Sequence, residues 1–274
     1  MKMKKYLNAV FIALVCAAKI FAQEKEDPPI QDNSFLIEEA YNQEAGIIQH
    51  INAFTRMRNG DWTYTFTEEV PIGSQKHQFS VTLPVRKVGG FSGGETGLGD
   101  IGLNYRYQLV NNRKTAVAPR FSVLLPTGSA ERERGAGGVG LQFNLPVSYQ
   151  FSRRFVSHSN AGLTVTPRAK NRLGERARTT DYNLGQSLVW LAAPRFNALV
   201  EVVWNNTETV IGYRQTRRET EVLINPGVRW AHNFSNGLQI VPGVSVPLGV
   251  GPSRGKRGIF LYLSFEHPVG RKPE

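Results

Sequence analysis

The side chains that could carry catalysis in this 274-residue chain do not form a recognisable site. The most suggestive group is His158-Ser159-Asn160, because a serine hydrolase needs a nucleophile and a base within hydrogen-bond reach. In a β-strand, however, Ser159 points to the opposite face from His158. No spacing typical of a metal site links any two of the histidines, which are His50, His77, His158, His232 and His267. We therefore expect no enzyme activity, no catalytic residue, no metal and no cofactor.

The first 22 residues have the layout of a secretory signal peptide. Lys2, Lys4 and Lys5 precede an apolar stretch from Tyr6 to Ala18, which is too short to span a membrane. We expect cleavage after Ala22 or Ala18. The single cysteine, Cys16, lies in this segment, so the exported chain contains no disulfide. Its stability must come from the fold itself, as in closed barrels whose strand edges are all paired.

Beyond residue 46, apolar and polar residues alternate, which predicts strands rather than helices. The clearest case is 141–151, where every odd position is large and apolar. Twelve such segments occur, at 47–57, 62–66, 79–85, 101–109, 117–125, 141–151, 155–165, 182–192, 196–204, 222–230, 238–248 and 259–265. Aromatic residues near segment ends on the apolar face are typical of membrane-interface girdles, and they are Trp62, Tyr149, Phe151, Trp190, Trp204, Trp230 and Phe265. This placement favours a membrane barrel over a soluble β-sandwich, which would show the same alternation.

The connections between these segments alternate in length. Tight turns such as Pro71-Ile72-Gly73 are followed by longer loops rich in Gly and Arg, at 87–96, 127–138, 167–180, 205–220 and 249–258. Tight turns at one end and long loops at the other are the layout of an outer-membrane barrel. We predict an all-β fold, a transmembrane antiparallel up-and-down β-barrel of about twelve strands over residues 46–266 in the cell outer membrane. Residues 23–45 are a periplasmic N-terminal segment, predicted as a short helix, a plug or the start of the first strand, and residues 267–274 are a C-terminal tail.

The polar face of the predicted strands would line the barrel lumen. The candidates are Asp100, Asn104, Arg106, Arg120, Gln142, Asn144, His158, Asn160, Glu201 and Arg229. Charges of both signs can pair across a narrow bore, so these residues either lock the barrel or define a path for a solute. About twelve strands should enclose a narrow lumen that a loop or the N-terminal segment can occlude.

Basic residues crowd the predicted long loops and give the chain its net charge of +11. The candidates at the rim are Arg172, Arg176, Arg178, Arg214, Arg217 and Arg218. Arginine binds phosphate with two parallel donors, so these residues either contact membrane lipid and lipopolysaccharide or concentrate anionic solutes at the entrance. No nucleic-acid partner is expected, because the charges are scattered over loops of an exported chain without an aromatic stacking motif.

Three stretches of the chain are similar to a known family. They are Gly97-Leu98-Gly99-Asp100-Ile101-Gly102-Leu103 with Tyr105-Arg106-Tyr107, then Leu124-Leu125-Pro126-Thr127-Gly128-Ser129, and the closing strands through Phe265. Together they resemble the outer-membrane transporter family named after the meta pathway of phenol degradation, over residues 45–266. The resemblance implies an outer-membrane β-barrel that takes up small hydrophobic or aromatic compounds, and it brings no ligand-binding residues with it. One departure is that Glu266–Glu274 follow Phe265 where such barrels end in an aromatic residue, so the signal for the barrel-assembly machinery is expected to be internal.

The function predicted from these observations is a monomeric, narrow channel or transporter for small organic solutes. The alternative is a structural or surface-interaction barrel whose lumen is plugged. A barrel lipase or protease is the third hypothesis. Conductance of the refolded protein in a lipid bilayer distinguishes the first two, because a plugged scaffold passes no ions.

Overall fold

The computed structural model of the chain describes residues 34–90 and 93–269. The predicted signal peptide, residues 23–33 of the predicted N-terminal segment and residues 270–274 of the predicted tail lie outside the described residues. Among the described residues, no helix has the length and apolar character needed to cross a membrane.

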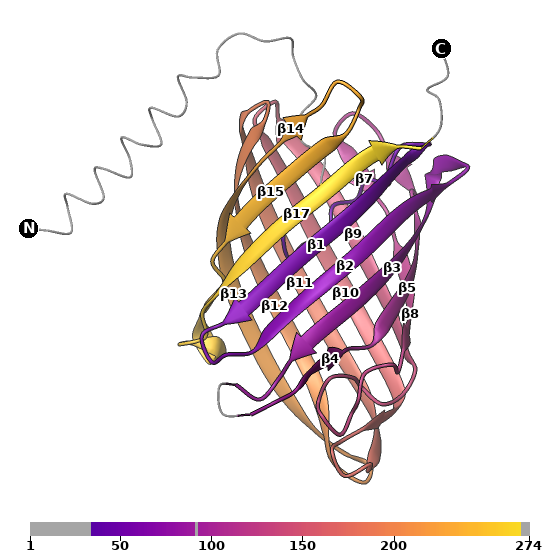
Figure 1. The fold of residues 1–274 in the computed structure, drawn as a ribbon, viewed down its shortest axis with the longest axis vertical. Helices are drawn as coiled ribbons and strands as arrows, with labels where there is room; N and C mark the ends of the chain where they lie inside the picture. Colours follow the sequence, from indigo (N-terminus) through magenta and orange to yellow (C-terminus); the bar gives the residue numbers. More distant parts are fainter. Residues whose placement is uncertain (1–33, 91–92, 270–274) are drawn as a thin grey trace, which may run out of the picture.

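The strands form one closed antiparallel sheet (Figure 1). Strand β1 (Ile47–Met57) pairs on one side with β2 (Trp62–Ile72) and on the other with β17 (Gly258–Pro268), so the sheet has no free edge. The other nine strands, some of them interrupted, are β3 (Ser74–Lys87), β4–β6 (Thr96–Leu98, Ile101–Tyr107, Val110–Asn111), β7–β8 (Thr115–Val117, Arg120–Leu125), β9 (Gly140–Ser152), β10 (Phe155–Lys170), β11 (Arg176–Ala193), β12 (Phe196–Gly212), β13–β14 (Gln215–Trp230, His232–Asn233) and β15–β16 (Gln239–Ser245, Leu248–Gly249). The predicted up-and-down barrel of twelve strands is confirmed.

The barrel is apolar outside and polar inside. Leu141 and Phe143 are 46% and 47% exposed, whereas the intervening and following polar residues turn inward and Asn144 is 4% exposed. The largest fully buried side chains include Arg229, Gln49, Gln78 and Glu201, which a soluble core would exclude. The aromatic residues Tyr149, Phe151, Trp190 and Trp230 are exposed on the outer face, as expected of girdles. This inverted burial excludes the β-sandwich.

Two of the predicted long loops are wrong. Strand β10 continues to Lys170 and β11 begins at Arg176, so the predicted loop 167–180 shrinks to residues 171–175. The predicted loop 205–220 shrinks to Tyr213-Arg214, where Arg214 adopts a left-handed φ of 58° in a tight turn. Figure 1 shows these hairpins projecting at the lower end of the barrel. Both faces of these projecting strand ends lie outside the apolar belt. Apolar and polar residues therefore do not alternate there, and the sequence pattern does not predict these parts of the strands.

Residues 34–45, which we call the inner segment, lie inside the barrel. Of the alternatives predicted for this part of the chain, the short helix is wrong, since none of the residues 34–45 is helical. A helix would satisfy its own backbone groups, whereas here the barrel wall supplies their partners. The chain then leaves the interior at Gly46, a left-handed residue with φ of 79°, and enters β1.

Candidate functional site

The first half of the inner segment is bound through its backbone by two wall residues. The N–H groups of Leu36 and Ile37 donate to the carboxylate of Glu201 at 3.0–3.1 Å. The Asn160 side chain accepts from Glu38 N–H at 2.9 Å and donates to the Glu38 carbonyl at 2.8 Å. Glu201 on β12 also accepts from Asn225 Nδ2 at 2.7 Å, so its charge is spread over several donors. These contacts hold the backbone of the inner segment against β10 and β12, and they do not depend on the identity of its side chains.

The second half is held by wall amides and one hydroxyl. Ala40 N–H donates to Ser148 Oγ at 2.8 Å. The amide of Gln108 donates to the Ala40 carbonyl at 2.7 Å and accepts from Asn42 N–H at 2.8 Å. Gln78 accepts from Gln43 N–H at 2.7 Å. An extended chain without its own hydrogen-bond ladder is stable in a closed interior because the wall pairs these groups.

Arg106 connects the inner segment to a buried charge. Its guanidinium donates to Asn42 Oδ1 and to the Tyr41 carbonyl, each at 2.7 Å. The same group lies 3.6 Å from the carboxylate of Glu69, and both side chains are buried. Gln78 donates to Glu69 at 2.7 Å and thereby joins this pair to the amide contacts. The cation, the carboxylate and the segment therefore form one network rather than an isolated ion pair.

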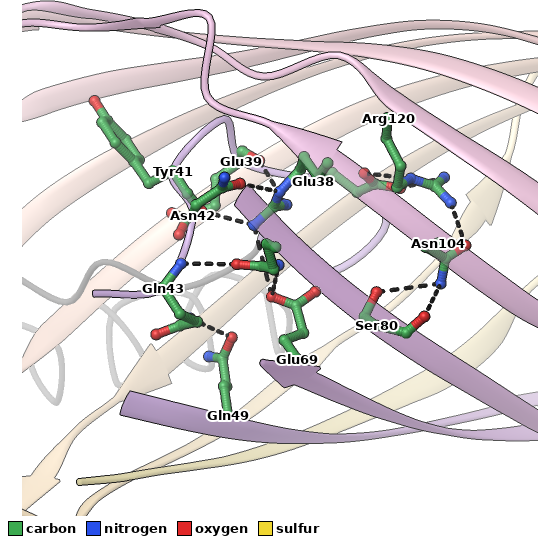
Figure 2. A network of polar contacts seen from close by, with 12 residues as sticks. Glu38, Glu39, Tyr41, Asn42, Gln43, Gln49, Glu69, Ser80, Asn104 and Arg120 are labelled. Carbon is green, nitrogen blue, oxygen red and sulfur yellow. Dashed lines mark hydrogen bonds and ion pairs between the residues drawn. The ribbon is translucent and has the colours of Figure 1, made fainter. Parts of the chain in front are cut away.

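Arg120 forms an ion pair directly with a carboxylate of the inner segment, that of Glu38, at 2.6 Å. Figure 2 shows Glu38 on one side of the Arg120 guanidinium and Asn104 on the other. The guanidinium also donates to Asn104 at 2.9 Å, Ser122 at 2.6 Å and Gln142 at 2.9 Å. Side chains of the inner segment, β5, β8 and β9 therefore hold this cation in place.

Three inward-facing glycines make room for the apolar side chains of the segment. Phe35 packs on the rings of Phe260 and Tyr262, with centroids 5.3 and 5.6 Å apart. A Cβ at Gly227 or Gly243 would lie 2.6 Å from the Phe35 ring, and a Cβ at Gly185 would overlap Ile37. Glycine inside a strand often marks such a close approach, so these positions are the signal that sequence analysis missed.

Two cavities flank the inner segment. The larger, of about 490 Å³, is bounded by the segment and by residues of β8 to β13. The smaller, of about 170 Å³, lies toward β1, β2, β3, β5 and β17. Both are lined by Leu36, Ile37, Glu38 and Arg120. The Glu38–Arg120 ion pair is thus shared by the two spaces.

The lining of the larger cavity combines apolar and polar side chains. Leu36, Ile37, Val203 and Leu223 supply apolar surface. The rest is mainly amide, hydroxyl and charged, and comprises Glu38, Arg120, Gln142, Asn144, Asn160, Thr164, Asp181, Asn183, Asn205, Thr207 and Glu221, besides Tyr182, Leu184 and Gly185. A ring or short chain carrying a polar substituent matches a lining of this composition.

The ten residues predicted for the lumen fall into three groups. Arg106, Arg120, Asn160 and Glu201 bind the inner segment directly, and Asn104 and Gln142 hold Arg120. Asn144, His158 and Arg229 are buried in the interior. Asp100 instead organises the rim, because its carboxylate accepts from the N–H groups of Gly128 and Ala136 at 2.9 and 2.7 Å. Sequence analysis missed Glu69, Gln78, Gln108 and Ser148, whose alternating polar pattern is no different from that of other strand residues.

Asp100 and the glycines around it explain the motif that carries the family resemblance. A Cβ at Gly135 would overlap the Asp100 carboxylate, so the loop can close on this residue only with glycine there. Thr127 Oγ1 donates to the Gly99 carbonyl at 2.7 Å and accepts from Ile101 N–H at 3.0 Å. The Gly-Asp and Thr-Gly stretches therefore bind each other and join the neighbouring strands β5 and β8.

A serine and a histidine do meet inside the barrel, on neighbouring strands rather than on one. Ser148 Oγ lies 2.8 Å from His158 Nδ1, and the two residues are direct partners in the β9–β10 ladder. Ser148 Oγ also accepts from Ala40 N–H at 2.8 Å, so it contacts both the histidine and the inner segment. Both residues are buried beneath the inner segment, and this pair supports the segment. Within residues 34–90 and 93–269, no group of three or more His, Cys, Asp or Glu side chains is arranged to hold a metal ion.

The six predicted rim arginines occupy different positions. Arg172 and Arg214 lie in the tips of the β10–β11 and β12–β13 hairpins. Arg176, Arg178, Arg217 and Arg218 lie on β11 and β13 rather than in loops. Arg172 pairs with Glu133 at 2.5 Å, and this hydrogen bond raises the pKa of the guanidinium. Arg218 pairs with Glu208 at 2.8 Å and Arg217 with Glu219 at 3.2 Å.

Comparison with known proteins gives one family and a set of barrels. The family model described as "Putative MetA-pathway of phenol degradation" matches residues 31–265. An outer membrane channel from Pseudomonas putida F1 superposes with a TM-score of 0.63 at 11% identity, covering 83% of this chain and 97% of the channel. The NanC porin superposes with a TM-score of 0.53 at 8% identity, covering 81% of this chain and 100% of the porin. These similarities show the fold, and no curated protein gives a match.

Proposed function

The chain belongs to the family described as "Putative MetA-pathway of phenol degradation", and from this premise we propose that it forms a narrow outer-membrane channel for small organic solutes. The outward apolar face and its aromatic residues support a position in the outer membrane, where lipid and lipopolysaccharide surround the barrel. Tight turns would face the periplasm and the projecting β10–β13 hairpins the outside. The barrel is monomeric in this proposal, and its closed sheet needs no strand from a second copy.

The observation that carries the proposal is the pair of cavities on either side of the inner segment. A lumen filled with side chains would leave no room for a solute, whereas here about 490 Å³ remains on one side and about 170 Å³ on the other. The inner segment acts as a plug that separates them. Movement of Glu38 away from Arg120 would join the two spaces without disturbing the wall, because both side chains line both cavities.

The solute proposed for this channel has an apolar body and a hydrogen-bonding substituent. Leu36, Ile37, Val203 and Leu223 would contact the body, and the amides of Asn160, Asn183 and Asn205 would pair with a hydroxyl or carboxylate group. Phenols and hydroxylated or carboxylated aromatic compounds satisfy both demands. Such solutes agree with the description of the family. The residues that line the larger cavity support the same solutes on their own.

Reconstitution of the full chain in planar bilayers and liposomes tests the proposal. We expect small conductance steps that shorten or flicker when phenol or benzoate is added, and liposome swelling by these solutes that exceeds swelling by trisaccharides. A variant lacking residues 34–45 should conduct several-fold more current, because the plug is absent. The channel function would be contradicted if the full chain passed no current with or without phenol while the deletion variant showed large conductance steps.

That same result would support the alternative, a structural barrel with a permanently plugged lumen. The dense pairing of the inner segment favours this alternative, since Glu201, Asn160, Gln108 and Arg106 each hold more than one group of the segment. The two functions therefore differ in whether the segment moves. Cysteine placed at Glu38 and probed with a membrane-impermeant thiol reagent would be modified in a working channel and protected in a permanent plug.

A further inference from the structure

A cluster of cations lies on the outer wall of the barrel, beyond the apolar belt. It consists of Arg168 and Lys170 on β10, Arg176 and Arg178 on β11, and Arg218 on β13, and we call it the exterior basic patch. Lys170 is the direct ladder partner of Arg176, next to the pair Ala169 and Ala177. Both alanines are buried, so they face the interior and the two cations share the outer face. Strands β10 to β13 follow one another in the sheet (Figure 1).

The charge of this patch is largely unbalanced. Arg218 pairs with Glu208 at 2.8 Å. In the described part of the chain, no carboxylate lies within ion-pair distance of the other members, which are Arg168, Lys170, Arg176 and Arg178. Like charges directly opposite each other on a ladder destabilise a sheet. An anion bound between Lys170 and Arg176 would remove that repulsion.

The surface next to the patch on the membrane side is aromatic and aliphatic. Tyr182 is on the outer face of β11, and the Arg218 guanidinium lies over its ring at 5.3 Å from the centroid. Leu184 follows on the same face, with Leu163 of β10 opposite Tyr182. From the rim toward the membrane centre, the wall therefore presents guanidinium groups, then an aromatic ring, then aliphatic side chains.

This order fits one kind of ligand, an amphiphile whose phosphate groups lie above its acyl chains. Guanidinium groups bind phosphate oxygens with two parallel hydrogen bonds. We propose that the exterior basic patch binds the phosphates of lipid A, the lipid part of lipopolysaccharide, while its acyl chains lie along Leu163 and Leu184. The proposal rests on the outer-membrane location given above, but it does not require that a solute passes through the lumen.

Binding of purified lipid A to the full chain in detergent tests this site. Native mass spectrometry would count bound lipid, and diphosphoryl lipid A would be compared with its monophosphoryl and dephosphorylated forms. The variant carries Arg176→Gln with Arg178→Gln, and the matched control carries Arg153→Gln with Arg154→Gln in the turn at the opposite end of the barrel. Both variants lose the same charge, so a general electrostatic effect would weaken binding equally.

We expect wild type and the control to retain diphosphoryl lipid A and the patch variant to bind it at least tenfold more weakly. Each dephosphorylation should also weaken wild-type binding. Equal loss in both variants, or equal affinity for all three lipids, would overturn the proposal. Should the patch variant fail to fold, the comparison of the three lipids on wild type decides alone. Conductance measured on the same preparations separates a failure of this site from a failure of the channel.

Discussion

The inner segment and the outer ends of β10–β13 place similar polar residues in opposite situations. Inside the barrel, Glu38, Arg106, Arg120 and Glu201 each contact several partners and are tied to the segment. On the projecting strand ends, ion pairs such as Arg217–Glu219 are exposed and single. A polar side chain in a closed interior must find protein partners, whereas at the outer ends water can solvate it. Burial and the surrounding solvent therefore decide how much each charge contributes to stability.

The largest difference in the free energy of unfolding is expected between a charge placed in the apolar belt and the same charge placed at the projecting end of one strand. Val202 and Val210 both lie on the outer face of β12, the first in the belt beside Trp204 and the second near the hairpin tip. Val202→Arg should reduce the free energy of unfolding by about 2–4 kcal/mol in lipid vesicles, because the charge enters hydrocarbon. Val210→Arg should change it by less than about 1 kcal/mol.

Urea unfolding in lipid vesicles, followed by tryptophan fluorescence, would measure both values. Equal losses would mean that β12 crosses the membrane in another position. A small loss at Val202 with a large one at Val210 would shift the belt toward the hairpin tips and contradict the assignment of the projecting ends.

The second contrast compares two glutamates on β12. Glu201→Ala leaves the N–H groups of Leu36 and Ile37 and the amide of Asn225 without their acceptor, which should cost about 1–3 kcal/mol. Glu208→Ala removes a partly exposed partner of Arg218 and the acceptor of the Thr180 N–H, which water can replace at this outer end, and should cost about 1 kcal/mol or less. Current through the Glu201 variant should also rise, because its inner segment is held less firmly.

Unfolding and conductance should be recorded on the same preparations of these two variants. A Glu201 variant with wild-type stability and wild-type current would show that the carboxylate does not anchor the segment. Its contacts to Leu36 and Ile37 would then be incidental to both stability and gating.

The third contrast concerns close packing against the segment. Gly185→Ala would place a methyl group against Ile37, and forcing such an overlap typically costs about 1–3 kcal/mol. Adding Ile37→Ala to that variant should recover part of the loss, because it removes the overlapping side chain. A double-mutant cycle in urea measures this coupling. Independent, additive effects would mean that Ile37 does not face Gly185 in the folded protein.

The same contrast explains what the sequence could and could not predict. Within the belt, lipid on one face and polar lumen on the other impose a period of two, so residues 141–151 were identified as a strand directly. Around Arg176 and Arg217 both faces of the strands lie beyond the belt. The period of two disappears there, and the sequence resembles that of a loop. The sequence pattern placed Arg176, Arg178, Arg217 and Arg218 in loops, whereas they lie on strands, and it did not show which basic residues share the outer wall.

The inner segment was harder to predict than the strands. Its partners, among them Gln78, Gln108 and Ser148, look like ordinary alternating polar residues, and they lie 35 to 108 positions away along the chain. No local pattern states that an amide on one strand will bind the backbone of a distant segment. The inward glycines at 185, 227 and 243 carried the available signal, because strand interiors rarely use glycine without a close neighbour.

The smallest effect separates two adjacent arginines on β13. Arg218 has Glu208 at 2.8 Å and the Tyr182 ring at 5.3 Å, and its side chain is about one-third exposed. Arg217 has one exposed partner, Glu219. We expect Arg218→Gln to cost about 0.5–1 kcal/mol and Arg217→Gln to cost about 0.5 kcal/mol or less, both falling as salt is raised. Unfolding at low and high sodium chloride would measure the pair. A larger loss at Arg217 would mean that this residue belongs to a network of contacts. Charges on the projecting strand ends would then not differ from charges in the barrel interior.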